Sequence, residues 1–386
     1  MGCPMDARQT ATGVPPWGAA GRRAAVLAHD RLGPLTSKTA MALVRYGRDR
    51  VVAAIDRSRA GADASEYLGA VAEGIPVVPS LRAALNHKPE VLHYGIAPEG
   101  GQLPAHDRAE VLEALRAGLD VACGMHTFIG DDPELVQAAQ RSGARIWDVR
   151  RPPARRRLAT GEGMRVGSPV VYVSGTDCSS GKMTVAIELV REARRRGIDA
   201  AFVATGQSGM MVGCDAGSCI DALPGDFMAG ETEALVLEVA ARRPGLIVVE
   251  GQASLHHPAY SAVTLALLHG SFPRAVVMCH QPGREHFKAF RDGPVRLHIP
   301  PISKEIALTE MLLEGTTRGK VVAVAIMATD EDPDEEMRQE AMLRASVGLP
   351  VADVLKEGPA PLLDAVLEAV ERGVGAVPAR ARGRGE

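Results

Sequence analysis

Short apolar runs alternate with segments of helical periodicity from Arg23 onward. The run AAVLAHD is followed by the helix-like segment TSKTAMALVRYG and then by the run VVAAID. Such an alternation is typical of βαβ units, whose strands form a parallel sheet. It continues to residue 150, so residues 23–150 predict a Rossmann-like α/β domain of ordinary size.

A second alternation of the same kind occupies residues 167–386. Its strand segments, such as SPVVYVSGT and GLIVVEGQ, are continuous runs of apolar residues rather than alternating apolar and polar positions. Continuous apolar strands are expected where helices cover both faces of a sheet. The second half therefore predicts another parallel α/β sheet, in a P-loop NTPase-like domain.

Two segments fall outside these alternations. Residues 151–166 contain paired prolines and a run of arginines, which break both the helical and the strand period, so we expect a linker there. Residues 1–22 have neither a basic start followed by an apolar run nor a complete myristoylation signal, and we expect a disordered extension. The chain is thus predicted to be a two-domain α/β protein.

Composition narrows the classes of partner. The 47 acidic and 44 basic residues nearly balance, so neither a nucleic acid nor a membrane surface is an expected partner. The six cysteines show no zinc-binding spacing, and no apolar stretch is long enough to span a bilayer. We expect a cytoplasmic homo-oligomer that acts on a small molecule.

The clearest chemical signal is the segment VYVSGTDCSSGKMT at residues 171–184. A strand, a glycine-containing turn and a helix beginning at Lys182 would place backbone N–H groups and the positive end of the helix around one point, which is how proteins bind phosphate. The spacing G-x5-G-K is one residue longer than the common form. The predicted phosphate-binding residues are Gly175, Thr176, Asp177, Ser179, Ser180, Gly181, Lys182, Met183 and Thr184.

Met183 stands where phosphoryl-transferring loops carry a Ser or Thr. In those loops the hydroxyl binds Mg²⁺, whereas a thioether is a weak ligand for so hard a cation. Thr184 could supply the hydroxyl only if the start of the helix were rotated. We therefore predict a loop that binds phosphate and no metal.

Polar residues follow the later strands. A glycine-rich segment after the second strand of this half carries Gln207, Ser208 and Asp226, and glycine-rich backbone permits close approach to a ligand. Glu250 ends the strand LIVVE, and His257 lies in the loop after it. Because the carboxyl ends of parallel strands meet at one edge, these side chains are expected to converge near Lys182.

The loop and the segment VVEGQASL together resemble the corresponding parts of dethiobiotin synthetases. A wider series, including ATGQSGMMV, IDALPGDFMAGETE and CHQPGR, resembles a two-domain bacterial family long known only as a domain of unknown function. One branch of that family is known as D-glutamate N-acetyltransferase. The resemblance extends from residue 23 to about residue 372.

This resemblance implies an N-acetyltransferase that moves an acetyl group from acetyl-CoA to the amino group of D-glutamate. The phosphates of coenzyme A would lie on the predicted loop. A base must deprotonate the amine before it attacks the thioester, and the candidates are Asp226, Glu250 and His257. Gln207, Ser208 and Arg284 are the predicted substrate ligands, since an arginine can pair with a substrate carboxylate.

Two other functions are compatible with the sequence. One is an ATP-dependent enzyme of the dethiobiotin-synthetase type, which activates a carboxylate or carbamate with ATP and Mg²⁺ as cofactors. The other is a nucleotide-binding regulatory protein without turnover. A Mg²⁺-dependent release of ADP would distinguish the first from an acetyltransferase.

Overall fold

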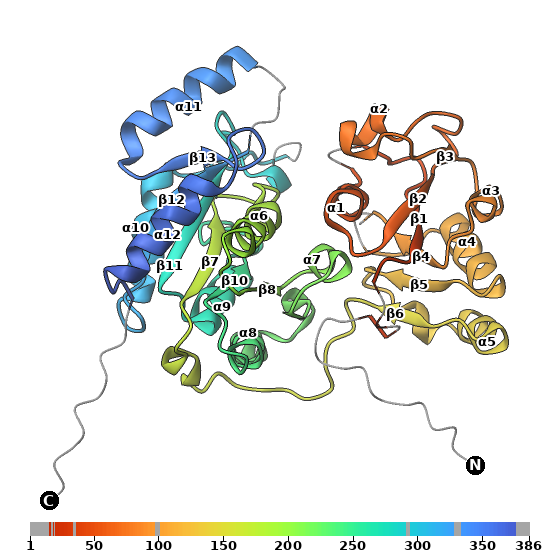
Figure 1. The fold of residues 1–386 in the computed structure, drawn as a ribbon, viewed down its shortest axis with the longest axis horizontal. Helices are drawn as coiled ribbons and strands as arrows, with labels where there is room; N and C mark the ends of the chain where they lie inside the picture. Colours follow the sequence, from red (N-terminus) through yellow and green to blue (C-terminus); the bar gives the residue numbers. More distant parts are fainter. Residues whose placement is uncertain are drawn as a thin grey trace, which may run out of the picture. The chain divides into compact units, whose positions relative to one another are not determined.

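The computed structural model describes residues 15, 16, 18, 20–33, 36–96, 101–290, 294–327 and 333–375. Most of the predicted extension at residues 1–22 lies outside the described residues. The chain forms two compact units (Figure 1). The first comprises Met1–Pro153 with Gly206–Ala222, and the second comprises Ala154–Thr205 with Leu223–Glu386.

The first unit is built on a parallel sheet with the strand order β3-β2-β1-β4-β5-β6. Its strands are nearly all buried, as the apolar runs predict. The order reverses on either side of β1, which is characteristic of a doubly wound Rossmann-like sheet. The strands are β1 (Arg23–Leu27), β2 (Arg50–Ile55), β3 (Val77–Val78), β4 (Val91–Tyr94), β5 (Asp120–Cys123) and β6 (Ile146–Asp148).

Local sequence signals set the helices of this unit. At the start of α5, Asp132 accepts hydrogen bonds from the N–H groups of Glu134 and Leu135, and Pro133 occupies the first turn. Gly143, with φ of 79°, ends the helix in the left-handed conformation. The helices are α1 (Lys38–Tyr46), α2 (Ser65–Leu68), α3 (Leu81–Ala84), α4 (Ala105–Arg116) and α5 (Pro133–Ser142).

The segment Gly206–Ala222 groups with the first unit, although the sequence analysis assigned it to the second domain. It contains α7 (Gln207–Val212) and the short strand β9 (Ala216–Gly217). Met210, Met211 and Val212 of α7 are buried, and the Arg48 N–H donates to the Val212 carbonyl at 3.0 Å. Burial of this apolar run next to α1 explains the grouping.

The second unit contains a parallel sheet in which β13, β12, β11, β7, β10 and β8 follow one another in that order. All six residues of β7 are buried, as a strand between two helical layers requires. The predicted parallel α/β class is confirmed for both units. The strands are β7 (Val170–Gly175), β8 (Ala200–Ala204), β10 (Leu246–Glu250), β11 (Ala275–His280), β12 (Lys320–Ile326) and β13 (Val351–Asp353).

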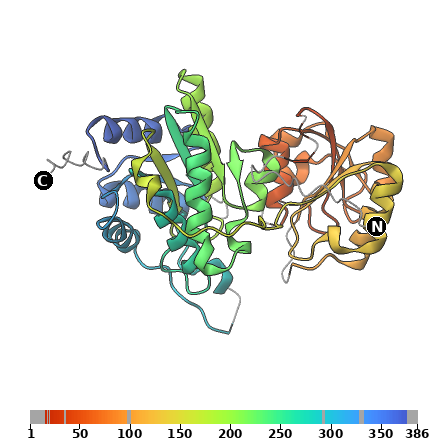
Figure 2. The same cartoon turned by 90° about the horizontal axis from the view of Figure 1, so that it is seen from below.

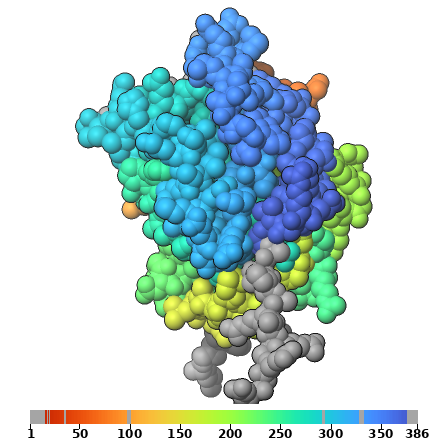
Figure 3. Space-filling model, turned by 90° about the vertical axis from the view of Figure 1, so that its left-hand side faces the viewer, coloured from red at the N-terminus to blue at the C-terminus, as the bar shows by residue number. Residues whose placement is uncertain are grey.

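Helices cover both faces of this sheet (Figure 2). Contacts place α6 and α12 on one face and α8, α9 and α10 on the other. Helices α10, α11 and α12 form much of the surface in Figure 3. Their bounds are α6 (Lys182–Arg195), α8 (Gly225–Ala240), α9 (Ser261–Ser271), α10 (Ile302–Leu313), α11 (Pro333–Val347) and α12 (Ala360–Glu371). Within the described residues, none of the helices is long and apolar enough to cross a membrane.

Candidate functional site

The predicted phosphate loop joins the central strand β7 to α6, and two of its glycines are required by close contacts. A Cβ atom on Gly175 would lie 2.6 Å from the Ser180 hydroxyl oxygen and 3.1 Å from the Lys182 ammonium. Gly181 has a φ of 90°, and a Cβ atom there would lie 2.3 Å from Cγ of Met327. A larger residue at Gly175 would displace the Ser180 side chain of the loop, and one at Gly181 would displace Met327 and strain the backbone.

Lys182, the predicted phosphate-binding lysine, is buried. Its side chain folds back into the loop, where Nζ donates to the Asp177 carbonyl at 2.5 Å and to the Ser180 hydroxyl at 3.2 Å. Burial lowers the pKa of this ammonium. The loop therefore surrounds a positive charge with its own polar groups.

Met183 and Thr184 occupy the second and third positions of α6 and are half-buried. Successive residues of an α-helix point about 100° apart around its axis. Because α6 begins regularly at Lys182, the Thr184 hydroxyl points in a different direction from the Met183 thioether. Thr184 does not take the position of the hydroxyl that Met183 replaces.

Asp177 ties the loop to the segment after β11. Its buried carboxylate accepts hydrogen bonds from the Cys178 N–H at 2.6 Å, from Arg284 Nη1 at 3.0 Å and from the Lys288 N–H at 2.8 Å. Arg284 also donates to the Cys178 carbonyl at 2.7 Å. The structure thus places the predicted substrate ligand Arg284 in contact with the loop, where it holds the turn in shape.

A second contact joins the loop to β11. The Thr176 N–H donates to the Cys279 carbonyl at 3.0 Å, and the Thr176 hydroxyl lies 2.9 Å from His280 Nδ1. Burial, with the nearby Arg284, lowers the pKa of His280 to about 4, so this ring is neutral at pH 7. His280 ends β11 and so lies at the same edge of the sheet as the loop.

His257 is fully buried beside the loop. Its ring stacks on Tyr260, with centroids 4.7 Å apart, and meets the edge of Phe287 at 5.0 Å. Nδ1 accepts the Ala259 N–H at 3.2 Å, which assigns the proton of the neutral ring to Nε2. Burial lowers its pKa, so the neutral form is favoured.

The Nε2 atom of His257 lies 3.6 Å from a carboxylate oxygen of Asp177, too far for a hydrogen bond. Among the described residues it has no hydrogen-bond partner. Because Nε2 carries the proton, it can donate a hydrogen bond but cannot accept a proton there. This differs from the predicted role of His257 as a base.

Glu250 lies at the carboxyl end of β10, in register with Val173 of the neighbouring strand β7. Its side chain is 7% exposed and accepts the Thr205 N–H at 3.1 Å. The Thr205 hydroxyl in turn donates to the Glu250 carbonyl at 3.0 Å. Lys182, Glu250 and His257 therefore all lie at the same edge of the sheet.

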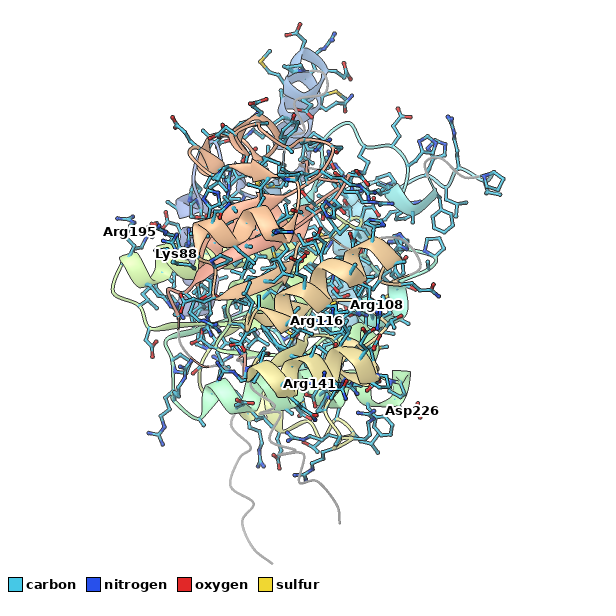
Figure 4. The ribbon with its side chains drawn as sticks, turned by 90° about the vertical axis from the view of Figure 1, so that its right-hand side faces the viewer. Lys88, Arg108, Arg116, Arg141, Arg195 and Asp226 are labelled. Carbon is cyan, nitrogen blue, oxygen red and sulfur yellow. The ribbon has the colours of Figure 1, made fainter. Side chains whose placement is uncertain are left out.

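Asp226, which is labelled in Figure 4, is exposed in the first turn of α8. One turn further along, the Ala229 carbonyl lies against Gly270 near the end of α9. Helix α9 leads away from the His257 loop, so this contact is remote from the phosphate loop. The structure does not bring Asp226 to the other predicted catalytic residues.

Gln207 and Ser208 make their side-chain contacts within the first unit. The Gln207 side-chain oxygen accepts from Arg150 at 3.4 Å, and the Ser208 hydroxyl lies 2.8 Å from that of Thr39. Arg150 also forms an ion pair with Asp221 at 2.6 Å. Gln207 therefore joins Arg150 and Asp221 in a polar cluster, and Ser208 pairs separately with Thr39.

Cys178 is the one residue between Gly175 and Thr184 that the sequence analysis did not select. Its sulfur, a His257 ring nitrogen and an Asp177 carboxylate oxygen all lie within 4.8 Å of one another. A metal ion there would lie near two cations, Lys182 and Arg284, which interact electrostatically with this group. The surroundings therefore suit an anion better than a metal ion.

Another set of potential ligands lies on the segment after β11. Glu285, His286 and His298 offer atoms within 4.8 Å of one another, and the two histidines form an antiparallel bridge. Their rings lie 4.1 Å apart. These residues could hold a divalent cation.

Comparison with known proteins identifies the two domains. Residues 57–152 match a model described as the Rossmann-like N-terminal domain of DUF1611, a domain of unknown function, and residues 157–363 match its P-loop domain. A DUF1611 family protein from Anabaena variabilis, known from a crystal structure, is 36% identical in sequence to this chain, and the two structures superpose with a TM-score of 0.83. The match covers 90% of this chain and 100% of the Anabaena chain.

Two curated relatives carry the name D-glutamate N-acetyltransferase. The relative from Tritonibacter scottomollicae is 34% identical over 279 residues, which is 72% of this chain and 81% of the relative. The relative from Pseudoalteromonas sp is 33% identical over 266 residues, 68% of this chain and 77% of the relative. The chain therefore belongs to the DUF1611 family, in which a Rossmann-like domain precedes a P-loop domain.

Proposed function

We propose that this protein is an N-acetyltransferase that moves an acetyl group from acetyl-CoA to the amino group of an acidic amino acid, with D-glutamate as the first candidate. The names of two relatives that are 33–34% identical support the proposal. The observation that carries it is the loop itself. It has the backbone and the lysine of a phosphate-binding turn but has Met183 in place of the metal-binding hydroxyl.

Coenzyme A carries a diphosphate and a ribose phosphate, which the loop N–H groups, Lys182 and the first turn of α6 would bind. Acyl transfer needs no metal at the phosphates, because the bond that breaks is the thioester. Phosphoryl transfer does need charge neutralisation there, usually by Mg²⁺. Met183 thus favours a carrier whose phosphates are held but not cleaved.

The side chains at this edge of the sheet have chemically different roles in the proposal. The amino group of an amino acid is mostly protonated at neutral pH, and Glu250 is our candidate for the base that removes its proton. His257 Nε2–H would instead donate to the negative charge that develops on the acetyl oxygen. A donor of this kind is typically worth about 3–4 kcal/mol in the transition state.

Purified protein should release CoA from acetyl-CoA and form an N-acetylated product when D-glutamate is added, with EDTA present. Chromatography of both products across a panel of D- and L-amino acids would identify the amine substrate. Glu250→Gln should lose most of the rate, whereas Glu368→Gln, a substitution at a surface ion pair with Arg372, should not. ADP release that requires Mg²⁺, with no acetyl transfer to any amine, would overturn the proposal in favour of the ATP-dependent alternative.

A further inference from the structure

Cys178 lies in the phosphate loop between two cations, Lys182 and Arg284, and one carboxylate, Asp177. It is partly exposed, and it precedes the first turn of α6 by four residues. Its backbone is held on both sides, because its N–H donates to Asp177 and its carbonyl accepts from Arg284. Lys182 interacts electrostatically with it. A partly exposed thiol near basic side chains and a helix N-terminus is the setting of reactive cysteines, since it favours the thiolate.

His257 provides an independent observation at the same place. Its ring is fully buried and fixed by aromatic neighbours, yet Nε2 has no hydrogen-bond partner among the described residues. A ring nitrogen of His257 lies within 4.8 Å of the Cys178 sulfur. A buried N–H without a hydrogen bond is costly. The Asp177 carboxylate lies 3.6 Å from Nε2, and a thiolate or an acyl oxygen on Cys178 would give this N–H a second acceptor.

Two other cysteines of the described residues show the contrast. Cys123 ends β5 and Cys279 lies in β11, and both are fully buried. Burial raises the pKa of each thiol to about 12. Such thiols stay protonated and do not act as nucleophiles at neutral pH.

We propose that Cys178 is the nucleophile that carries the acetyl group between acetyl-CoA and the amine, an inference that rests on the proposed acetyltransferase function. The Cys178 thiolate attacks the thioester carbonyl carbon, a new sulfur–carbon bond forms, and the bond to the CoA sulfur breaks with release of the CoA thiolate. Glu250 removes one proton from the ammonium group, and the neutral amine then attacks the acetyl carbon of Cys178. The carbon–nitrogen bond forms, the bond to the cysteine sulfur breaks, and the second proton of the nitrogen passes to the departing cysteine thiolate.

The test is to incubate the full chain with acetyl-CoA and no amine, and to map the acetylated peptide by mass spectrometry. One acetyl group is expected on Cys178. Neutral hydroxylamine should remove it, as it removes a thioester but not an amide on a lysine. Cys178→Ala should not be labelled, and its turnover should fall at least about 100-fold. Cys214→Ala, a control in the segment grouped with the first unit, should keep the labelling and the turnover of the wild type.

A Cys178→Ser variant covers the case in which alanine disturbs the loop, because a serine should take up acetyl slowly and form a stable ester. If the wild type acetylates D-glutamate and both Cys178 variants do so within about tenfold of the wild-type rate, Cys178 is not the nucleophile. The acetyltransferase function would still stand. Acetyl-Cys178 without transfer to any amino acid would support the inference and refute the proposed amine substrate. If the wild type shows no acetyl-Cys178 and no turnover, both the nucleophile and the acetyltransferase function are refuted.

Discussion

Asp177→Asn keeps the shape of the side chain that ties the phosphate loop to the segment after β11, and removes its charge. The carboxylate is 1% exposed and accepts three hydrogen bonds, one of them from Arg284 at 3.0 Å. An Asn oxygen can still accept some of them, but its amide cannot neutralise the guanidinium. The loop should therefore be destabilised through one identifiable ion pair.

Breaking a buried ion pair by removing one partner typically costs about 3–5 kcal/mol, because the other charge stays desolvated. The Arg284 side chain is 19% exposed and keeps its bond to the Cys178 carbonyl, so the lower end applies. About 3 kcal/mol corresponds to a fall in Tm of roughly 6–12 °C for a domain of 150–250 residues. The affinity for acetyl-CoA should fall too, since the loop loses its support.

Thermal unfolding followed by fluorescence would measure the shift. Asp364→Asn is a matched control: Asp364 also pairs with an arginine, Arg196, but its side chain is 64% exposed, and surface pairs contribute little. The control should melt close to the wild type. Equal shifts for the two variants would refute the assignment of Asp177 as the buried anchor of the loop.

Variants in and beside the loop test separate features of it. Gly175→Ala should abolish acetyl-CoA binding in calorimetry, because a Cβ atom would lie 2.6 Å from the Ser180 hydroxyl oxygen. Gly167→Ala is the control, since a Cβ atom there would have nothing within 4 Å, and it should bind acetyl-CoA normally. Normal binding by Gly175→Ala would contradict the loop geometry. Lys182→Met should fold, as judged by circular dichroism, but should bind acetyl-CoA about 10–100-fold more weakly. This loss of affinity is the one expected when a charge-assisted hydrogen bond is removed. Unchanged affinity would exclude Lys182 from phosphate binding. Burial lowers the pKa of His280 to about 4, below about 6.5 in the unfolded chain. The unfolded state therefore takes up the proton first, and stability should fall from pH 6.5 towards pH 4. Urea midpoints at pH 7 and pH 5 should differ less for His280→Gln than for the wild type, and an equal difference would contradict this pKa.

The parallel sheets could be predicted because the signal is local. The strand VVYVSG of β7 is apolar at nearly every position and is buried at every position, and the turn that follows it carries its own glycines and lysine. The position of Glu250 beside this turn follows from the rule that the carboxyl ends of parallel strands meet. These features needed no knowledge of distant contacts.

The rest depends on contacts between residues far apart in the chain. Arg284 and Asp177 are separated by 107 residues, and only the folded structure shows that the arginine is engaged with the loop. The proton position on His257 depends on one backbone N–H. The glycine-rich segment after β8 gave no local sign that its apolar residues, such as Met210, would be buried in the first unit.

The central claim is that the loop binds the phosphates of an acyl carrier without a metal ion, because Met183 occupies the position of the metal-binding hydroxyl. The most direct test is calorimetric titration of the wild type with acetyl-CoA and with ATP, each in Mg²⁺ and in EDTA. We predict that acetyl-CoA binds equally well in both buffers and that Mg²⁺ does not strengthen the binding of ATP. Tight binding of ATP that requires Mg²⁺, with weak binding of acetyl-CoA, would contradict the claim.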